Sequence, residues 1–170
     1  MAVRRLKSTK TIDLTEYKEA LRDTRKYVSR SLLDDEILEL NALKEKYKNI
    51  PKHKNVKARL DLLMNALVES NTHEERLVEI RVILSRCQRI AEKQYALAKN
   101  AVIQSMDVLG KTKKDQDLLF EMYLGFFDSV SSDVAYKIEQ VDFVLEQVRN
   151  TAYNLKTMIS VLKTMQEQET

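Results

Sequence analysis

The chain contains only two glycines and one proline in 170 residues. These residues form most tight turns and hairpins, because glycine reaches backbone conformations closed to other residues and proline fixes its own φ angle. A fold built from many strands and short turns needs more of both. Residues with high helix propensity, such as Leu, Lys, Glu and Ala, are abundant instead. The sequence therefore predicts an all-α fold with few connections, at a length typical of one domain.

Capping residues suggest where the first helices begin. Asp13, with Glu16 three residues later, forms a capping box that follows a flexible basic arm over residues 1–11. We expect a first helix from there to about residue 33 and a second over 34–47, which Asp34 caps. One unbroken helix over 13–48 is the alternative, because no glycine or proline interrupts this stretch.

Two further signals divide the helical region 12–110. Pro51 disfavours helix at the residue before it and predicts a turn, followed by a third helix over about 54–69. Thr72 and Glu75 form a second capping box, which predicts that a separate long helix over 73–108 begins here.

The C-terminal region 111–170 contains a long helix or a helix pair, opened by a third capping pattern at Thr112 and Asp115. From residue 134 onward, apolar residues recur at alternating spacings of four and three, which is typical of a coiled coil. This predicted seam either packs against helices of the same chain or mediates self-association, and it consists of Val134, Ile138, Val141, Leu145, Val148, Ala152, Leu155, Ile159 and Leu162. Together these patterns predict an elongated bundle of four to six helices, two of them long, with a coiled-coil-like helix at the C-terminal end.

Positive charge is concentrated in the first third of the chain. Residues 1–60 carry a net charge of +7, whereas the remainder carries a net charge of −4. Seven cations and one acid lie in the loop over 44–59. Such clusters bind the phosphate backbone of nucleic acid, because binding releases counterions, and an aromatic ring among them offers a surface on which bases stack. The alternative is that lysines solubilise an exposed turn. The candidate nucleic-acid-binding residues are Arg4, Arg5, Lys7, Lys10, Lys44, Lys46, Tyr47, Lys48, Lys52, His53, Lys54, Lys57 and Arg59.

The sequence contains no recognisable catalytic or cofactor motif. Two glycines are too few for a phosphate-binding loop or a dinucleotide fingerprint. His73 lacks the second ligand of a His-Glu-x-x-His motif, and we interpret it as an ordinary residue of a first helical turn. Cys87 lies among apolar residues and is expected to be a buried core thiol. We therefore expect no enzyme activity, no metal, no cofactor and no small-molecule ligand.

A single cysteine excludes an internal disulfide and favours a reducing compartment. No apolar run approaches the ~20 residues of a membrane helix. The expected location is the cytoplasm or a particle assembled inside a cell, such as a virion. The first hypothesis for function is a non-enzymatic assembly protein that forms a homo-oligomer or docks into a larger complex. The alternative is a non-specific nucleic-acid-binding accessory factor that uses the basic loop and arm.

Overall fold

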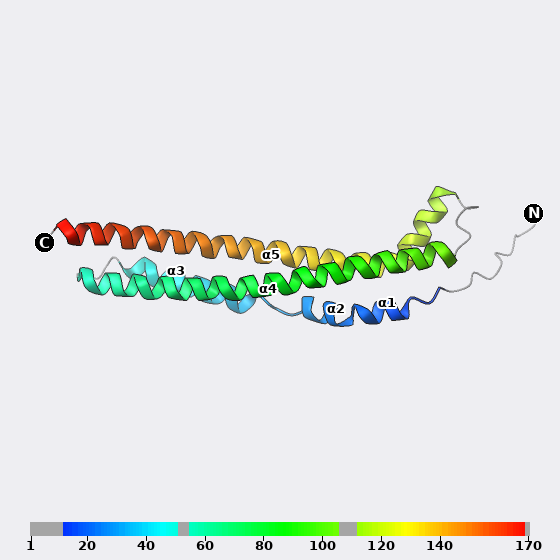
Figure 1. Cartoon of the computed structure of the whole chain (residues 1–170), viewed down its shortest axis with the longest axis horizontal. Coiled ribbons are helices and arrows are strands. Elements are labelled where there is room, and N and C mark those ends of the chain that lie inside the picture. Colours follow the sequence, from blue (N-terminus) through cyan, green and yellow to red (C-terminus); the bar gives the residue numbers. More distant parts are fainter. Residues whose placement is uncertain (1–11, 51–54, 106–111, 169–170) are drawn as a thin grey trace, which may run out of the picture. The chain divides into compact units, whose positions relative to one another are not determined.

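The structure, a computed structural model, describes residues 12–50, 55–105 and 112–168 (Figure 1). These residues contain no strand, so the predicted all-α fold is confirmed. The described helices are α1 (Thr15–Ala20), α2 (Arg22–Val28), α3 (Asp34–Asn49), α4 (Val56–Ser105) and α5 (Lys113–Gln168). The prediction of two long helices is confirmed too, since α4 has 50 residues and α5 has 56.

The chain divides into two compact units, and both long helices contribute a segment to each. Unit 1 comprises residues 1–29 and 86–135, and therefore contains α1 and α2. Unit 2 comprises residues 30–85 and 136–170, and contains α3. Each unit has its own set of buried apolar side chains.

The core of unit 1 combines small residues of α4 with large residues of the other helices. Ala91 and Ala98 are fully buried, and alanine at these positions lets a neighbouring helix approach closely. Phe127 of α5 is also fully buried, and its ring meets that of Phe126 edge to face. Three further aromatic residues of α5, Phe120, Tyr123 and Phe126, are partly buried and pack against this core.

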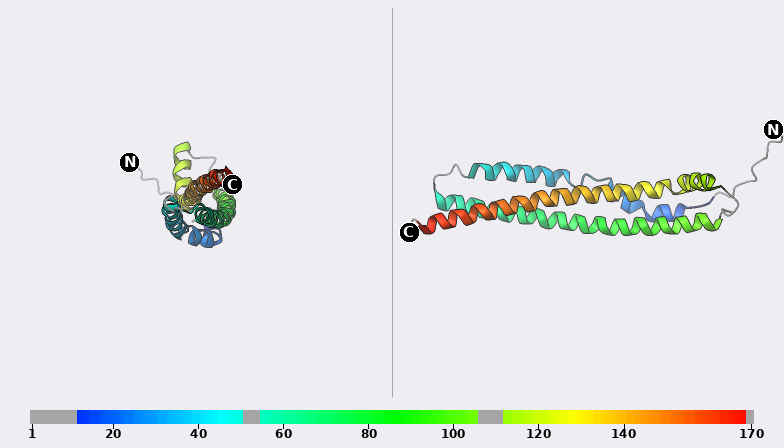
Figure 2. Two further views of the ribbon diagram at one scale, coloured as in Figure 1. Left: turned by 90° about the vertical axis from the view of Figure 1, so that its left-hand side faces the viewer. Right: turned by 90° about the horizontal axis from the view of Figure 1, so that it is seen from above.

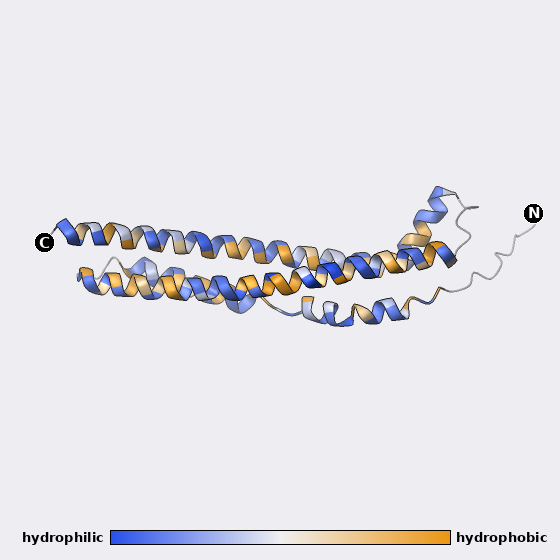
Figure 3. Ribbon diagram, viewed as in Figure 1, coloured by the Kyte–Doolittle hydropathy of each residue, from blue (hydrophilic) through white to orange (hydrophobic). Residues whose placement is uncertain are grey.

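In unit 2, α3 lies alongside segments of α4 and α5 (Figure 2). The core here joins Leu43 and Ile50 to Leu63 and Ala66 of α4 and to the end of the heptad pattern on α5. Apolar and hydrophilic positions alternate along α5 in the way that a helix with one buried face requires (Figure 3). The helix itself is unbroken through Gly125, although its first turns bend out of line with those that follow (Figure 1).

The predicted boundary at Thr72 is wrong, because α4 continues through it. The Thr72 hydroxyl donates to the carbonyl of Val68, one turn earlier in the same helix, instead of capping a new one. No glycine or proline interrupts the surrounding residues, so nothing local ends the helix there. The separate helices expected over 54–69 and 73–108 are accordingly one helix in the described range.

The first predicted helix is also revised. It is divided into α1 and α2 at Leu21, a fully buried residue at which one helix ends and the next begins. The capping box expected at Asp13 does not form, because no side chain caps α1. The Asp13 carboxylate accepts a hydrogen bond from the backbone N–H of Thr15 at 3.0 Å. A hydrogen bond with the Thr15 side chain and, to a smaller extent, this backbone bond lower the pKa of Asp13. At the start of α3 no side chain caps the helix, so the expected cap by Asp34 does not form. The third expected cap is present, since Asp115 N–H donates to the Thr112 hydroxyl at 3.3 Å.

Candidate functional site

The residues of the predicted basic loop are only partly within the described structure. The arm residues Arg4, Arg5, Lys7 and Lys10, and loop residues Lys52, His53 and Lys54, lie outside it. Tyr47 packs against the core of unit 2. Lys57 is exposed, whereas Arg59 is half-buried and its Nε has no hydrogen-bond partner among the described residues.

The described cations of the predicted loop lie in helices, Lys44, Lys46 and Lys48 in α3 and Lys57 and Arg59 in α4. The three lysines of α3 have partners within unit 2. Lys44 donates to the side-chain oxygen of Gln147 at 3.3 Å, and so joins α3 to α5. Lys46 pairs with Glu69 of α4 at 2.5 Å. Lys48 pairs with Glu45 one turn earlier at 2.6 Å, and that hydrogen bond raises the pKa of Lys48. These contacts reduce the positive charge that this part of the loop offers to an external anion.

All nine residues of the heptad pattern are buried within the chain, from Val134 at 0% exposure to Leu162 at 9%. Leu155, Ile159 and Leu162 belong to the core of unit 2. Their apolar face is therefore covered by helices of the same chain. A second copy has little access to these side chains while the fold stays closed.

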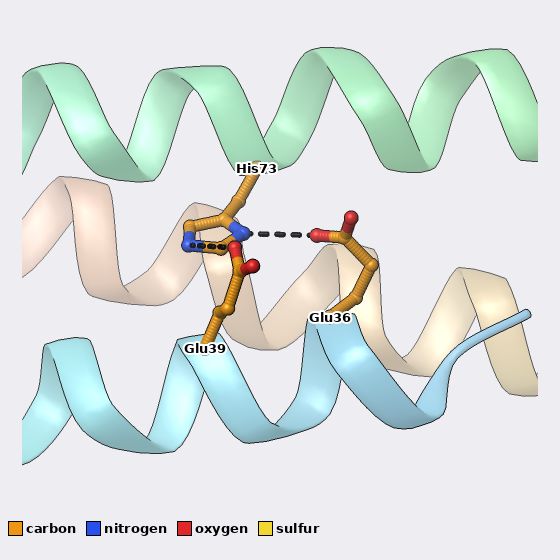
Figure 4. A group of neighbouring side chains, drawn as sticks. All are labelled: Glu36, Glu39 and His73. Atoms are coloured by element: carbon orange, nitrogen blue, oxygen red, sulfur yellow. Dashed lines mark hydrogen bonds and ion pairs between the residues drawn. The ribbon is translucent and has the colours of Figure 1, made fainter.

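A buried polar cluster between α3 and α4 is a feature that the sequence did not predict (Figure 4). His73 is 6% exposed and Glu36 is 9% exposed, and the imidazole Nδ1 lies 2.9 Å from the Glu36 carboxylate. The other ring nitrogen, Nε2, lies 3.6 Å from the carboxylate of Glu39. His73 is thus an interior residue of a long helix, and the interpretation of it as a first-turn residue is wrong.

Arg76 completes this cluster. Its Nη2 donates to Glu39 at 2.5 Å, and this bond is the main reason that the pKa of Arg76 is raised. Its Nε forms an ion pair with Glu36 at 2.9 Å, without the geometry of a hydrogen bond. Nη2 of Arg76 also lies 2.9 Å from Nδ1 of His73. Depending on the tautomer of the imidazole, Nδ1 either donates to Glu36 or accepts from Arg76.

The cluster has the donor types of a metal site, because Glu36, Glu39 and His73 offer ligand atoms that lie within 4.8 Å of one another. The guanidinium of Arg76, however, already pairs with both carboxylates. A divalent cation would have to displace it and would lie beside a fixed positive charge. The arrangement fits a structural contact that fixes α3 on α4 better than it fits a metal centre.

The Cys87 thiol is buried, as expected from its apolar neighbours in the sequence. Burial raises the pKa of this thiol, and a side-chain hydrogen bond with Thr24 acts in the opposite direction. Because the thiolate is the reactive form, a raised pKa suits a core residue and not a nucleophile.

A groove between α3 and α5 is a further surface feature of unit 2. We call it the α3–α5 groove; it has a volume of about 390 Å³. The side chains that line it are Leu33, Asp34, Ile37, Leu40, Asn41, Lys44, Lys137, Gln140, Phe143, Val144 and Gln147. Leu33, Leu40 and Val144 are buried and form its floor, whereas Phe143 is 63% exposed at its edge. Sequence reasoning missed this site because its members come from segments a hundred residues apart.

Comparison of the chain with protein families, curated proteins and solved structures finds no match. Among the described helices, none has the length and apolar content needed to cross a bilayer.

Proposed function

We propose that the protein is a non-enzymatic assembly protein that self-associates through the α3–α5 groove. The observation that carries this proposal is the exposure of Phe143, which is 63% accessible beside a floor of buried apolar side chains. Tyr136, seven residues earlier on the same helix, is 59% exposed. Exposed aromatic residues beside an apolar hollow are characteristic of interaction surfaces, since covering them removes apolar area from water.

The patch has the parts that a self-complementary interface needs. In a two-fold dimer the same patch serves both partners, so it must carry both a projecting group and a hollow that receives it. Phe143 projects, and the groove of about 390 Å³ beside it has room for a ring. Full burial of a phenylalanine side chain contributes roughly 1.5–3 kcal/mol to the free energy of association, once for each copy.

The charges at the rim support the same arrangement. Asp34 lies on α3 and Lys137 on α5, so one patch carries both signs. In a two-fold dimer in which α3 of each copy packs on α5 of the other, Asp34 of one copy faces Lys137 of the other. Such rim pairs contribute little affinity, but they favour one orientation of the partner.

The test is the solution mass by light scattering after size exclusion, for the wild type, Phe143→Glu and Tyr153→Glu. Tyr153 is the matched control, because it is also an aromatic residue of α5, is 70% exposed and does not line the groove. We expect the wild type and Tyr153→Glu to form the same oligomer, and Phe143→Glu to become a monomer with unchanged helicity by circular dichroism. A monomeric wild type at every concentration, or an oligomer that Phe143→Glu leaves intact, would contradict the proposal.

A further inference from the structure

Unit 1 carries a second surface, separate from the α3–α5 groove, on which cations gather. Arg22, Arg25, Lys26 and Ser29 lie on one helix face, because Arg25 and Lys26 are three and four positions from Arg22 and four and three positions from Ser29. All four are exposed, whereas Thr24 and Val28 of the same helix are buried against the rest of unit 1. The packing of α2 therefore turns this face outward.

Phe126 of α5 borders the cations and completes an open cleft of about 540 Å³, which we call the α2–Phe126 cleft. The guanidinium carbon of Arg25 lies 5.5 Å from the centroid of the Phe126 ring, and Nζ of Lys18 lies 5.7 Å from it. At these distances the ring attracts both cations. The contact restricts two long side chains in advance, which lowers the entropy that binding an anion would cost.

These cations differ from the α3 lysines of unit 2. Lys44, Lys46 and Lys48 each bond to a neighbour within the chain. Arg22, Arg25 and Lys26 form no ion pair with a carboxylate of the described residues. Their positive charge is consequently available to an external anion.

We infer that the α2–Phe126 cleft binds the phosphodiester backbone of nucleic acid. Arginine matches phosphate oxygens through two parallel N–H donors, and lysine adds a point charge. The cleft is open and exposed, which suits an extended backbone better than an enclosed small anion. The Phe126 ring already faces two cations, so it is not free to stack on a base. The contact is therefore independent of base sequence.

Acidic residues of the same helices set the strength of this interaction. Glu19 and Asp23 are exposed beside the cations and lower the local positive potential. We expect weak binding by a single chain, with a strong dependence on salt. Self-association through the α3–α5 groove would multiply such contacts, but the cleft does not depend on it.

The experiment measures binding of a short fluorescein-labelled oligothymidylate by anisotropy, from about 50 to about 200 mM salt. The test variant is the triple substitution Arg22→Gln, Arg25→Gln and Lys26→Gln. The matched control, Lys114→Gln, Lys156→Gln and Lys163→Gln, removes the same charge from exposed positions outside the cleft. Circular dichroism verifies that both variants keep the helicity of the wild type.

The wild type should bind with an affinity that falls as salt rises. The test variant should bind at least about tenfold more weakly at low salt, with a log–log salt slope smaller by about 2, because each phosphate contact on a single strand contributes about 0.7. The control variant should stay close to the wild type. Arg25→Lys, which keeps the charge but not the two parallel donors, should lose part of the affinity.

Three results would overturn the inference. The first is equal binding by the wild type and the test variant, and the second is an equal loss in the control, which would indicate net charge alone. The third is a wild type that ignores the oligonucleotide but binds inorganic phosphate or phosphatidylserine vesicles, which would assign the cleft to another anion. A monomeric Phe143→Glu protein that still binds the oligonucleotide separates this inference from the proposed assembly.

Discussion

The imidazole Nδ1 of His73 lies 2.9 Å from the carboxylate of Glu36, in a buried contact that joins α4 to α3. The two residues are 37 positions apart in the chain. A buried carboxylate without a donor is costly, so this pair, with Arg76, fixes where α3 lies on α4 in unit 2.

Replacing His73 by alanine should therefore destabilise the protein. The change removes a hydrogen bond to a charged group and leaves a gap in a buried position, for an expected loss of about 2–3 kcal/mol in the free energy of unfolding. Urea denaturation followed by circular dichroism measures it. Asn71→Ala is the control, because Asn71 is exposed on the same helix and should change stability by less than about 0.5 kcal/mol. Equal losses of stability in His73→Ala and Asn71→Ala would show that the His73–Glu36 contact contributes nothing to the free energy of unfolding.

Thr72→Ala distinguishes a continuous α4 from the two helices that the sequence suggested. At a helix N-cap, loss of the threonine hydroxyl costs about 1 kcal/mol. Inside a helix the same change should be neutral or stabilise by a few tenths of a kcal/mol, because alanine has the higher helix propensity. We expect the second result from thermal or urea unfolding, since the Thr72 hydroxyl bonds to Val68 within the helix. A loss of about 1 kcal/mol would place a helix start at this residue.

The buried Cys87 thiol predicts a loss of stability at alkaline pH. Its pKa is raised above the ordinary value of 9.0 by burial, so the unfolded chain releases this proton at lower pH than the folded one does. The unfolded state then binds fewer protons, and stability falls as the pH rises through about 9. The difference in unfolding free energy between the wild type and Cys87→Ala should shrink between about pH 8 and about pH 10. If this difference in unfolding free energy stays constant from about pH 8 to about pH 10, Cys87 is not a buried thiol with a raised pKa.

Much of the fold follows from patterns that are local in the sequence. The scarcity of glycine and proline predicts the all-α fold, and the heptad spacing identifies nine buried residues of α5. Periodicity could also have prevented the error at Thr72. Leu63, Ala66, Ser70, His73 and Leu77 are all buried and follow the same alternation of three and four without a break. This continuous buried face outweighs the capping pattern at Thr72, so the helix continues through that residue.

The candidate sites were beyond the reach of such patterns. The α3–α5 groove and the α2–Phe126 cleft each combine residues about a hundred positions apart, and no spacing rule connects them. The charge pattern did find the basic loop over 44–59. It could not reveal that three of the lysines there bond to neighbours in the chain, whereas Arg22, Arg25 and Lys26 of α2 form no such ion pair with described residues.

The most direct test of the proposed assembly uses Phe143→Trp, which creates the sole tryptophan of the chain, since the natural sequence contains none. The fluorescence emission of this tryptophan is recorded over a series of protein concentrations, and light scattering measures the molar mass at each one. Tyr153→Trp is the control. We predict that the emission of Phe143→Trp moves to shorter wavelength as the mass rises, because the ring enters the groove of a second copy and leaves water. The emission of Tyr153→Trp should stay constant. A mass that rises while the emission of Phe143→Trp does not move would show that the chains associate elsewhere.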